Sequence, residues 1–203
     1  MTPLLEIENM WIEVPRSGGH ERVPILRDVS LHVDDGEAVG LVGESGSGKS
    51  MTTRAVMRLL PQGARRAGAI RYRGSEIDKF DRKQLARYRS HDIGMIFQDP
   101  RAHINSLWSV GDFIIEAVVA TGQIGRNEAI ERAIALLGEV GISNGAERMR
   151  QYPHELSGGL LQRIMIVAAL MPSPDFILAD EISTALDVTV QSEVMAILNE
   201  LRE

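Results

Sequence analysis

The chain has 203 residues, no cysteine, and 28 acidic residues against 22 basic ones, which gives a formal charge of −6. Its length fits one domain or somewhat more, and 44% hydrophobic and 25% charged residues are typical of a soluble globular protein. The lack of cysteine excludes a disulfide scaffold and a cysteine-ligated metal site in this stretch. The longest apolar run, residues 164–171, is far shorter than the ~20 residues that a membrane-spanning helix needs.

Positive charge is concentrated in residues 65–89, where nine basic residues stand against three acidic ones. The basic residues are Arg65, Arg66, Arg71, Arg73, Lys79, Arg82, Lys83, Arg87 and Arg89. One interpretation is a solvated face of the fold, and the other is a patch near anionic phosphate of lipid or nucleic acid. Since nucleic-acid-binding domains are usually basic throughout, the acidic chain as a whole disfavours a dedicated nucleic-acid binder.

The first half of the chain alternates between strand and helix patterns. Strands are expected at Leu4–Val14, Ile25–Val33, Ala69–Arg73 and Asp92–Phe97, and helices at Met51–Leu60 and Asp81–Arg89. The short apolar run Glu37–Val42 leads into glycine-rich sequence, and we expect it to form a strand.

The middle of the chain is expected to be wholly helical. Within residues 110–147, Ile130, Ile134 and Leu137 recur at the spacing of one helix face. Leu160–Leu170 is expected to be another helix, and Phe176–Ala179 a buried strand. A last helix is indicated by its apolar face, which consists of Val190, Val194, Ile197, Leu198 and Leu201. The αβ alternation predicts a mainly parallel sheet with helices on its faces.

Residues 43–50, GESGSGKS, match the phosphate-binding pattern G-x-x-x-x-G-K-[ST]. The glycines let the backbone curl so that its N–H groups point at phosphate oxygens, and the following helix directs its positive end there. Lys49 supplies a charge for the β- and γ-phosphates, and Ser50 offers a hydroxyl to Mg²⁺. The alternative is a glycine-rich turn without a ligand. The expected nucleotide-binding residues are Gly43, Glu44, Ser45, Gly46, Ser47, Gly48, Lys49, Ser50 and Met51.

A second motif, FILADE at residues 176–181, is an apolar strand that ends in two carboxylates. Ligands of α/β sheets bind beyond the carboxyl ends of the strands. Asp180 is therefore a candidate for holding Mg²⁺, and Glu181 for orienting or deprotonating an attacking water. By itself, the motif is equally explained as a strand end with acidic residues.

A third motif, LSGG at residues 156–159, precedes an expected helix. Ser157 is a good helix N-cap, which is the structural interpretation. The functional interpretation is a second anion site, formed by a hydroxyl, the N–H groups of Gly158 and Gly159, and a helix N-terminus. Since the phosphate loop already holds one nucleotide, such a site suits a nucleotide bound to a neighbouring subunit.

Two further motifs join these three: IFQDP, which carries Gln98 after an expected strand, and TALD at 184–187. Together, the five motifs make the chain resemble the ATP-binding subunits of ABC transporters, from Leu4 onward. YPHELSGG at 152–159 and TALDVTVQ at 184–191 resemble the peptide/nickel importer branch. The resemblance implies an α/β P-loop NTPase fold with a RecA-like core, an antiparallel β subdomain and an inserted helical subdomain. The implied parts are residues 1–99, the core with the β subdomain; 100–157, the helical subdomain; and 158–203, the rest of the core.

The resemblance also implies roles for the motif residues. Glu181, Lys49 and Gln98 would be catalytic, and Ser50, Gln98 and Asp180 would hold Mg²⁺. Two ATPase subunits, identical or paralogous, would enclose ATP between the phosphate loop of one and Ser157, Gly158 and Gly159 of the other. The helical subdomain would dock on membrane permease subunits at the cytoplasmic face, and an extracytoplasmic solute-binding protein would take part indirectly. No nucleic-acid partner is expected.

Several positions depart from the family pattern. Val14 stands where an aromatic residue usually stacks on adenine, with Trp11 nearby, and Ile182 replaces a proline after Glu181. Leu160–Leu161 replaces Met-Arg after the LSGG motif. The family's histidine after the next strand has no counterpart, so we expect the last core strand and the C-terminal extension of the branch to be missing. The transported solute is not encoded in these motifs.

The sequence alone leaves three functions open. The first is an ATPase subunit that energises import of peptides or similar solutes. The second is a fragment that binds nucleotide without turning it over, and the third is an ABC-type ATPase unconnected with transport.

Overall fold

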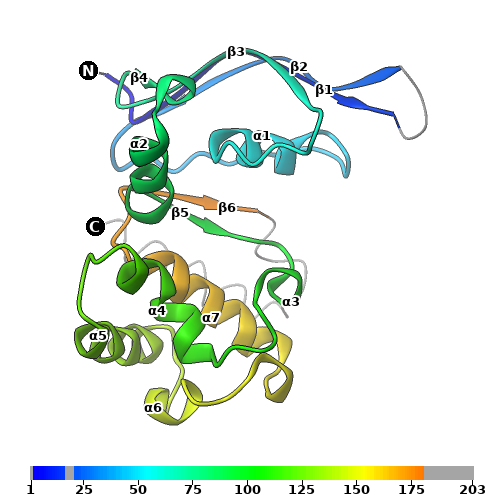
Figure 1. Cartoon of the computed structure of the whole chain (residues 1–203). Coiled ribbons are helices and arrows are strands. Elements are labelled where there is room, and N and C mark those ends of the chain that lie inside the picture. Colours follow the sequence, from blue (N-terminus) through cyan, green and yellow to red (C-terminus); the bar gives the residue numbers. More distant parts are fainter. Residues whose placement is uncertain (1, 17–20, 181–203) are drawn as a thin grey trace. The chain divides into compact units, whose positions relative to one another are not determined.

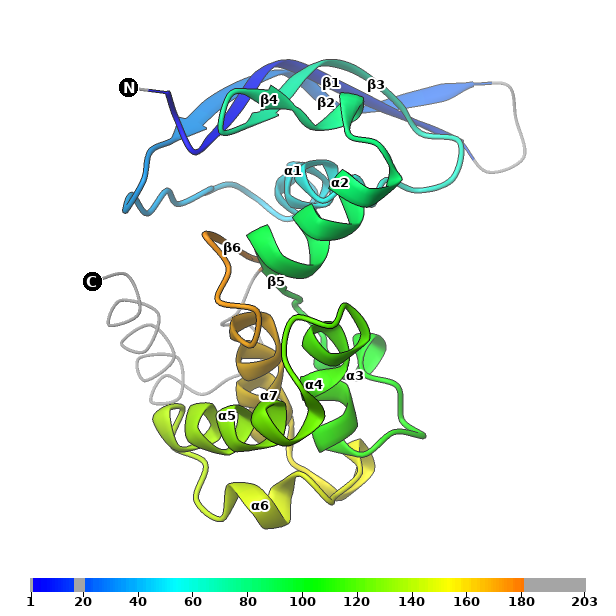
Figure 2. The ribbon, with the colours of Figure 1, turned by 60° about the vertical axis from the view of Figure 1, so that its left-hand side comes forward.

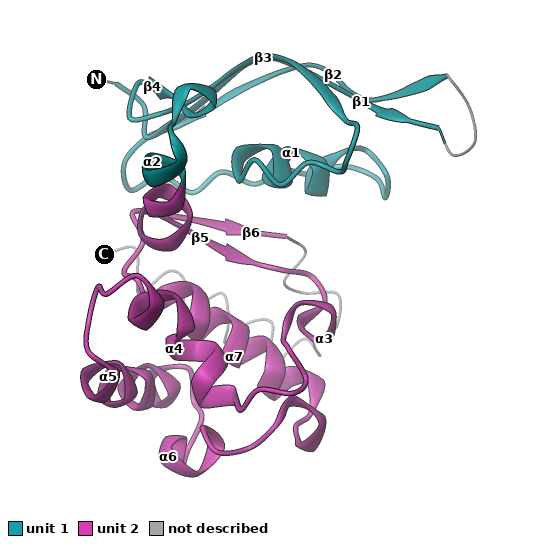
Figure 3. Ribbon diagram, viewed as in Figure 1, with its two compact units in different colours: residues 1–85 teal, residues 86–203 magenta. Residues whose placement is uncertain are grey.

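The computed structural model describes residues 2–16 and 21–180, and the chain divides into two compact units, residues 1–85 and 86–203 (Figure 3). The first unit contains a four-stranded antiparallel sheet in the order β2-β1-β3-β4. Its strands are β1 (Leu5–Pro15), β2 (Arg22–Val33), β3 (Arg65–Tyr72) and β4 (Ser75–Glu76). The strands expected at Leu4–Val14, Ile25–Val33 and Ala69–Arg73 are therefore confirmed, with shifted ends.

The central strand β1 changes its buried face halfway along, because it contains a bulge. Leu5 and Ile7 are buried before the bulge, and Met10 and Ile12 after it. At the bulge Asn9 has a φ of 45°, and it lies opposite Gly68 of β3, whose φ is +86°. A Cβ atom on Gly68 would lie 2.4 Å from the carbonyl oxygens of Glu8 and Asn9, so only glycine allows this close approach.

Helix α1 (Lys49–Val56) lies against one face of this sheet (Figure 1) and buries Thr52, Thr53, Ala55 and Val56. It ends before the expected Leu60, because Arg58 adopts a left-handed φ of 52°. The N–H groups of Arg58 and Leu59 then donate to the carbonyls of Ala55 and Arg54, which closes the helix. A short turn, η1 (Ile77–Lys79), and helix α2 (Arg82–Arg87) follow β4.

The expected strand at Glu37–Val42 is not formed. These residues have no regular secondary structure, and no described strand pairs with them. Val39 and Leu41 are about half exposed, and Val42 is 98% exposed. The prediction was wrong because an apolar run forms a strand only where a neighbour accepts and donates its backbone hydrogen bonds.

The second unit is mainly helical, and Figure 2 shows α4, α5 and α7 packed together. Its helices are η2 (Tyr88–Asp92), α3 (Pro100–His103), α4 (Val110–Ala120), α5 (Arg126–Glu139), α6 (Gly145–Arg148), η3 (Pro153–Glu155) and α7 (Gly158–Leu170). The expected apolar face of α5 is confirmed, since Leu137 is fully buried and Ile130 and Ile134 pack against the same core. The described part of the chain contains no helix long and apolar enough to cross a membrane.

Two strands of the second unit, β5 (Ile93–Ile96) and β6 (Phe176–Ala179), pair in parallel. The parallel pairing expected from the αβ alternation is thus present here, whereas the larger described sheet is antiparallel. All of β5 is buried, but of β6 only Leu178 is, so the prediction of a fully buried strand holds in part. Gly94 lets α7 pack closely on β5, because a Cβ atom there would lie 2.7 Å from the carbonyl oxygen of Ala169.

Candidate nucleotide-binding site

The phosphate loop, residues 43–48, is a largely exposed turn directly before α1. The N–H of Ser47 donates to the carbonyl of Glu44 at 3.2 Å. Gly46 and Gly48 have φ angles of +81° and +100°, a region that side chains with a Cβ atom rarely adopt. α1 begins directly after Gly48, so the N–H groups of its first turn take no part in the hydrogen bonds of the helix. This is the geometry that binds anions at a helix N-terminus.

Lys49 folds back over this loop. Its ammonium donates to the carbonyl oxygens of Gly43 and Glu44 at 2.9 and 3.0 Å. The side chain is therefore already held at the mouth of the loop, where its charge complements a phosphate. Ser50 and Met51 occupy the first turn of α1 and are half-buried.

The sequence pattern did not reveal what holds the loop in place. Gly48 packs against Leu26 of β2, and a Cβ atom at position 48 would lie 2.3 Å from Leu26 Cδ2. Leu26 is only 3% exposed and is part of the core of the first unit. Gly48 thus has two reasons to be glycine, a left-handed φ and a core side chain at contact distance.

Gln98 and Asp180 follow the carboxyl ends of the neighbouring parallel strands β5 and β6. The N–H of Asp180 donates to the carbonyl of Ile96 at 3.0 Å, which extends the strand pairing by one residue. Asp180 is 6% exposed. The two candidate Mg²⁺ ligands therefore share one edge of the small sheet, as parallel strands predict.

The segment that carries Gln98 is held at several points. Asp99 caps α3 by accepting from the N–H of Arg101 at 2.9 Å, and the ring of His103 stacks on Phe97 with centroids 3.9 Å apart. Arg101 also donates to the carbonyl of Leu156, at 3.4 Å. The segment after β5 is thereby tied to the LSGG motif, a link that sequence spacing gave no means of finding.

At the LSGG motif, Ser157 caps α7 by accepting from the N–H of Leu160 at 3.3 Å. The structural interpretation of Ser157 is therefore confirmed. Ser157 and Gly158 are exposed, and nothing lies within 4 Å of a Cβ atom built on Gly158, so the helix N-terminus is accessible. Leu161, which replaces the arginine of the family pattern, is fully buried in the helical core.

The expected site residues are divided between the two units, and some of them lie outside the described residues. The phosphate loop belongs to residues 1–85, whereas Gln98, Asp180 and Ser157 belong to residues 86–203. Glu181, Ile182, the TALD segment and the last expected helix lie outside the described residues. Trp11, which is near the position of the family's adenine-stacking residue, is 42% exposed, so the alternative that Trp11 is a core residue is wrong.

Among the described residues, no group of three or more histidine, cysteine, aspartate or glutamate side chains is arranged to hold a metal ion. Mg²⁺ at nucleotide sites usually binds through one or two carboxylates, the phosphates and water. Ser50 and Asp180, in different units, each carry an oxygen group of a kind that can bind Mg²⁺.

The glycine-rich loop that leads into α1, with the basic side chain folded over it, defines the class of P-loop nucleotide-binding proteins. The model of the family described as "ABC transporter" matches residues 26–184. The chain belongs to this family.

Relatives with known names agree with this assignment. The oligopeptide transport ATP-binding protein OppD of Bacillus subtilis is 40% identical over 205 residues, which cover 100% of this chain and 57% of the relative. OppD of Salmonella typhimurium is 39% identical over 199 residues, covering 98% and 59%. The chain thus spans a little under three fifths of the length of these two relatives.

The fold is also that of solved ABC cassettes. The dimeric structure of a post-hydrolysis state of the ATP-binding cassette MJ0796, bound to ADP and Pi, matches with a TM-score of 0.85 at 26% identity. The match covers 98% of this chain and 83% of that chain. The expected α/β fold of an ABC ATPase is therefore confirmed.

Proposed function

We propose that this chain is the nucleotide-binding part of an ABC importer ATPase that energises the uptake of peptides or similar small solutes. The observation that carries the proposal is the phosphate loop, in which Lys49 is held by two loop carbonyls at the N-terminus of α1. The similarity to two OppD proteins supports the peptide branch. In this proposal residues 1–99, 100–157 and 158–203 serve as the first part of the core, the helical subdomain and the rest of the core.

In the proposed reaction each motif residue has one task. The loop N–H groups and Lys49 bind the phosphates of ATP, and Ser50 with Asp180 and Gln98 holds Mg²⁺. Glu181 orients and deprotonates the water that attacks the γ-phosphate. Ser157 and the N–H groups of Gly158 and Gly159 bind the ATP of a second ATPase subunit, since their helix N-terminus is accessible and capped.

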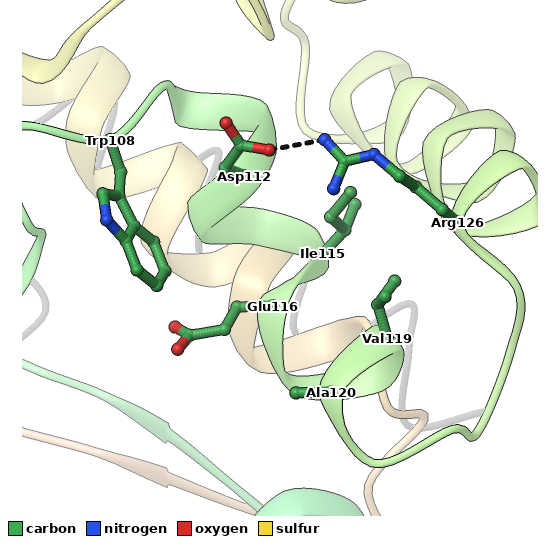
Figure 4. Close-up of a pocket in the computed structure, with 7 residues that line it drawn as sticks. All are labelled: Trp108, Asp112, Ile115, Glu116, Val119, Ala120 and Arg126. Atoms are coloured by element: carbon green, nitrogen blue, oxygen red, sulfur yellow. Dashed lines mark hydrogen bonds and ion pairs between the residues drawn. The ribbon is translucent and has the colours of Figure 1, made fainter.

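The helical unit offers a surface for the proposed permease partner at the cytoplasmic face of the membrane. A pocket of about 310 Å³ is lined by Trp108, by residues of α4 and by Arg126 of α5 (Figure 4). Leu107 beside it is 83% exposed, and Trp108 is 38% exposed. The exposed Glu116 also lines this pocket. A permease helix would therefore complement the surface if an apolar side chain entered the pocket and a neighbouring basic side chain paired with the Glu116 carboxylate.

The proposal is tested with the Lys49→Ala variant. Loss of the ammonium removes a charge-assisted contact to phosphate, and we expect ATP affinity to fall about tenfold or more. Lys83→Ala is the matched control, because Lys83 is an exposed lysine of the same unit outside the loop. Binding is measured by titration with a fluorescent ATP analogue. Equal affinity of Lys49→Ala and Lys83→Ala would overturn the assignment of the phosphate loop.

Hydrolysis separates the importer ATPase from a fragment that only binds nucleotide. Sustained ATP turnover by the 203-residue chain, above that of Glu181→Gln, supports the ATPase. Equal turnover of the two supports a binding fragment. Co-purification with a membrane permease, weakened by Trp108→Ala while ATP binding persists, distinguishes the importer from an ABC-type ATPase without a transport role.

A further inference from the structure

A second pocket, which has a more polar lining, lies in the first unit. It is at the end of α1 that is opposite the phosphate loop. Its volume is about 480 Å³, within the range of small-molecule sites. Its charged lining residues are Arg58, Arg66 and Asp78. Because α1 has eight residues, the pocket and the phosphate loop are separated by roughly 12 Å along the helix axis.

Arg58 occupies a backbone position that favours glycine. It follows Met57, the C-cap of α1, with a φ of 52°. Helices commonly end with glycine in this left-handed conformation, since other residues are strained there. The guanidinium of Arg58 donates to the carbonyl of Ile77 at 3.0 Å and lies 4.0 Å from the carboxylate of Asp78.

Arg66 of β3 brings a second guanidinium into the same pocket. It forms an ion pair with Asp78, and its side chain is only 11% exposed. Burial lowers the pKa of Arg66, and the positive charge of Arg58 lowers it further. Two positive charges and one negative charge therefore line the pocket, and the two guanidiniums repel each other.

This arrangement accounts for only part of the basic segment found in the sequence. Arg71 is held by the carboxylates of Glu6 and Glu8, at 2.9 and 2.8 Å, on the same sheet. Lys79 is largely exposed beside Glu76. Arg66 is thus a member of the segment whose charge is directed into a pocket rather than to the surface.

We propose that this pocket binds a small oxyanion, a phosphate or carboxylate group of a metabolite, between Arg58 and Arg66. Guanidinium groups bind both kinds of oxyanion through paired N–H donors. An anion there balances the surplus positive charge of the lining and relieves the repulsion between the two arginines. The site is distinct from the phosphate loop, because it uses neither the loop nor Lys49.

The experiment measures anion binding in the 203-residue chain that carries Lys49→Ala, so that the phosphate loop is weakened. Inorganic phosphate and acetate are titrated separately at constant ionic strength and followed by calorimetry. We expect saturable binding of at least one of them. Stronger binding of phosphate assigns the site to phosphate groups, and stronger binding of acetate assigns it to carboxylates. Absence of saturable binding of both overturns the proposal, whether or not the phosphate loop binds ATP.

Three variants test the residues. Arg66→Gln should weaken binding about tenfold, because it removes a charged donor. Arg65→Gln is the matched control, since Arg65 is an exposed neighbour on β3, and it should change affinity by about twofold or less. Arg58→Gly removes the other guanidinium and relieves the left-handed strain, so it should weaken binding about tenfold without lowering the melting temperature. Equal affinities of Arg58→Gly and Arg65→Gln would refute the site.

Discussion

The contact between Gly48 and Leu26 gives a prediction whose size follows from the structure. Replacing Gly48 by alanine places a Cβ atom at a φ of +100° and 2.3 Å from Leu26 Cδ2. The left-handed conformation costs about 1–2 kcal/mol for a residue with a Cβ atom. Because Leu26 is buried at 3% exposure, its Cδ2 methyl group has to shift within the core, and this should cost about 1–3 kcal/mol more.

Gly46→Ala is the matched control for this experiment. Gly46 also has a left-handed φ, +81°, but nothing lies within 4 Å of a Cβ atom built there. Both variants reduce the conformational freedom of the unfolded chain equally, so this effect cancels in their comparison. Gly48→Ala should therefore lower the free energy of unfolding by about 1–3 kcal/mol more than Gly46→Ala does.

The measurement is urea unfolding followed by tryptophan fluorescence. In a Trp108→Phe background only Trp11 remains, and Trp11 lies on β1, in the same unit as the contact. Leu26→Ala removes the methyl group that overlaps, so adding it to Gly48→Ala should cost about 1–3 kcal/mol less than adding it to the wild-type chain. Equal destabilisation by Gly46→Ala and Gly48→Ala, or strictly additive effects of Gly48→Ala and Leu26→Ala, would refute the reasoning.

Two further predictions concern the second unit. Ser157→Ala removes the N-cap of α7 and should lower the free energy of unfolding by about 1 kcal/mol, whereas Ser157→Gly should lower it by only about a few tenths of a kcal/mol. Urea unfolding in a Trp11→Phe background measures both losses, and equal losses would contradict the capping role. The Arg126 guanidinium, and then the Ser109 hydroxyl, lower the pKa of Asp112 from 3.8 by hydrogen bonding, so Asp112 stabilises the fold above its unfolded pKa and loses this effect as the pH falls through its lower folded pKa. The difference in melting temperature between wild type and Asp112→Asn should thus be constant near neutral pH and shrink below about pH 4, whereas a difference independent of pH would exclude this ion pair.

Much of the secondary structure followed from local pattern. The strands at β1, β2, β5 and β6 and the helix α7 lie close to where periodicity placed them, because a run of alternating or helically spaced apolar residues fits one backbone geometry. The failures have a different origin. The apolar run Glu37–Val42 has the composition of a strand, but pairing requires a partner, and no described strand provides one. α1 ends at Val56 rather than Leu60 because Arg58 adopts the conformation usually taken by glycine.

The candidate site also combines features that the sequence predicts with features that only the structure shows. The phosphate loop was recognised from eight consecutive residues, since the chemistry of phosphate binding depends on the order of neighbouring backbone and side-chain groups. Asp180 was expected at the carboxyl end of a strand, and the pairing of β5 with β6 places Gln98 beside that end. The link from Arg101 to Leu156 joins positions 55 residues apart, and no local pattern indicates such a contact.

The sequence by itself thus determined the family and the chemistry of the phosphate loop, because both are encoded in short runs whose residues act as neighbours. The tertiary structure alone decided which of the basic residues enters a pocket, that Leu26 restricts position 48 to glycine, and that Leu161 belongs to the helical core. These outcomes depend on burial and on contacts between distant segments. Their free energies arise only when the chain brings those segments together.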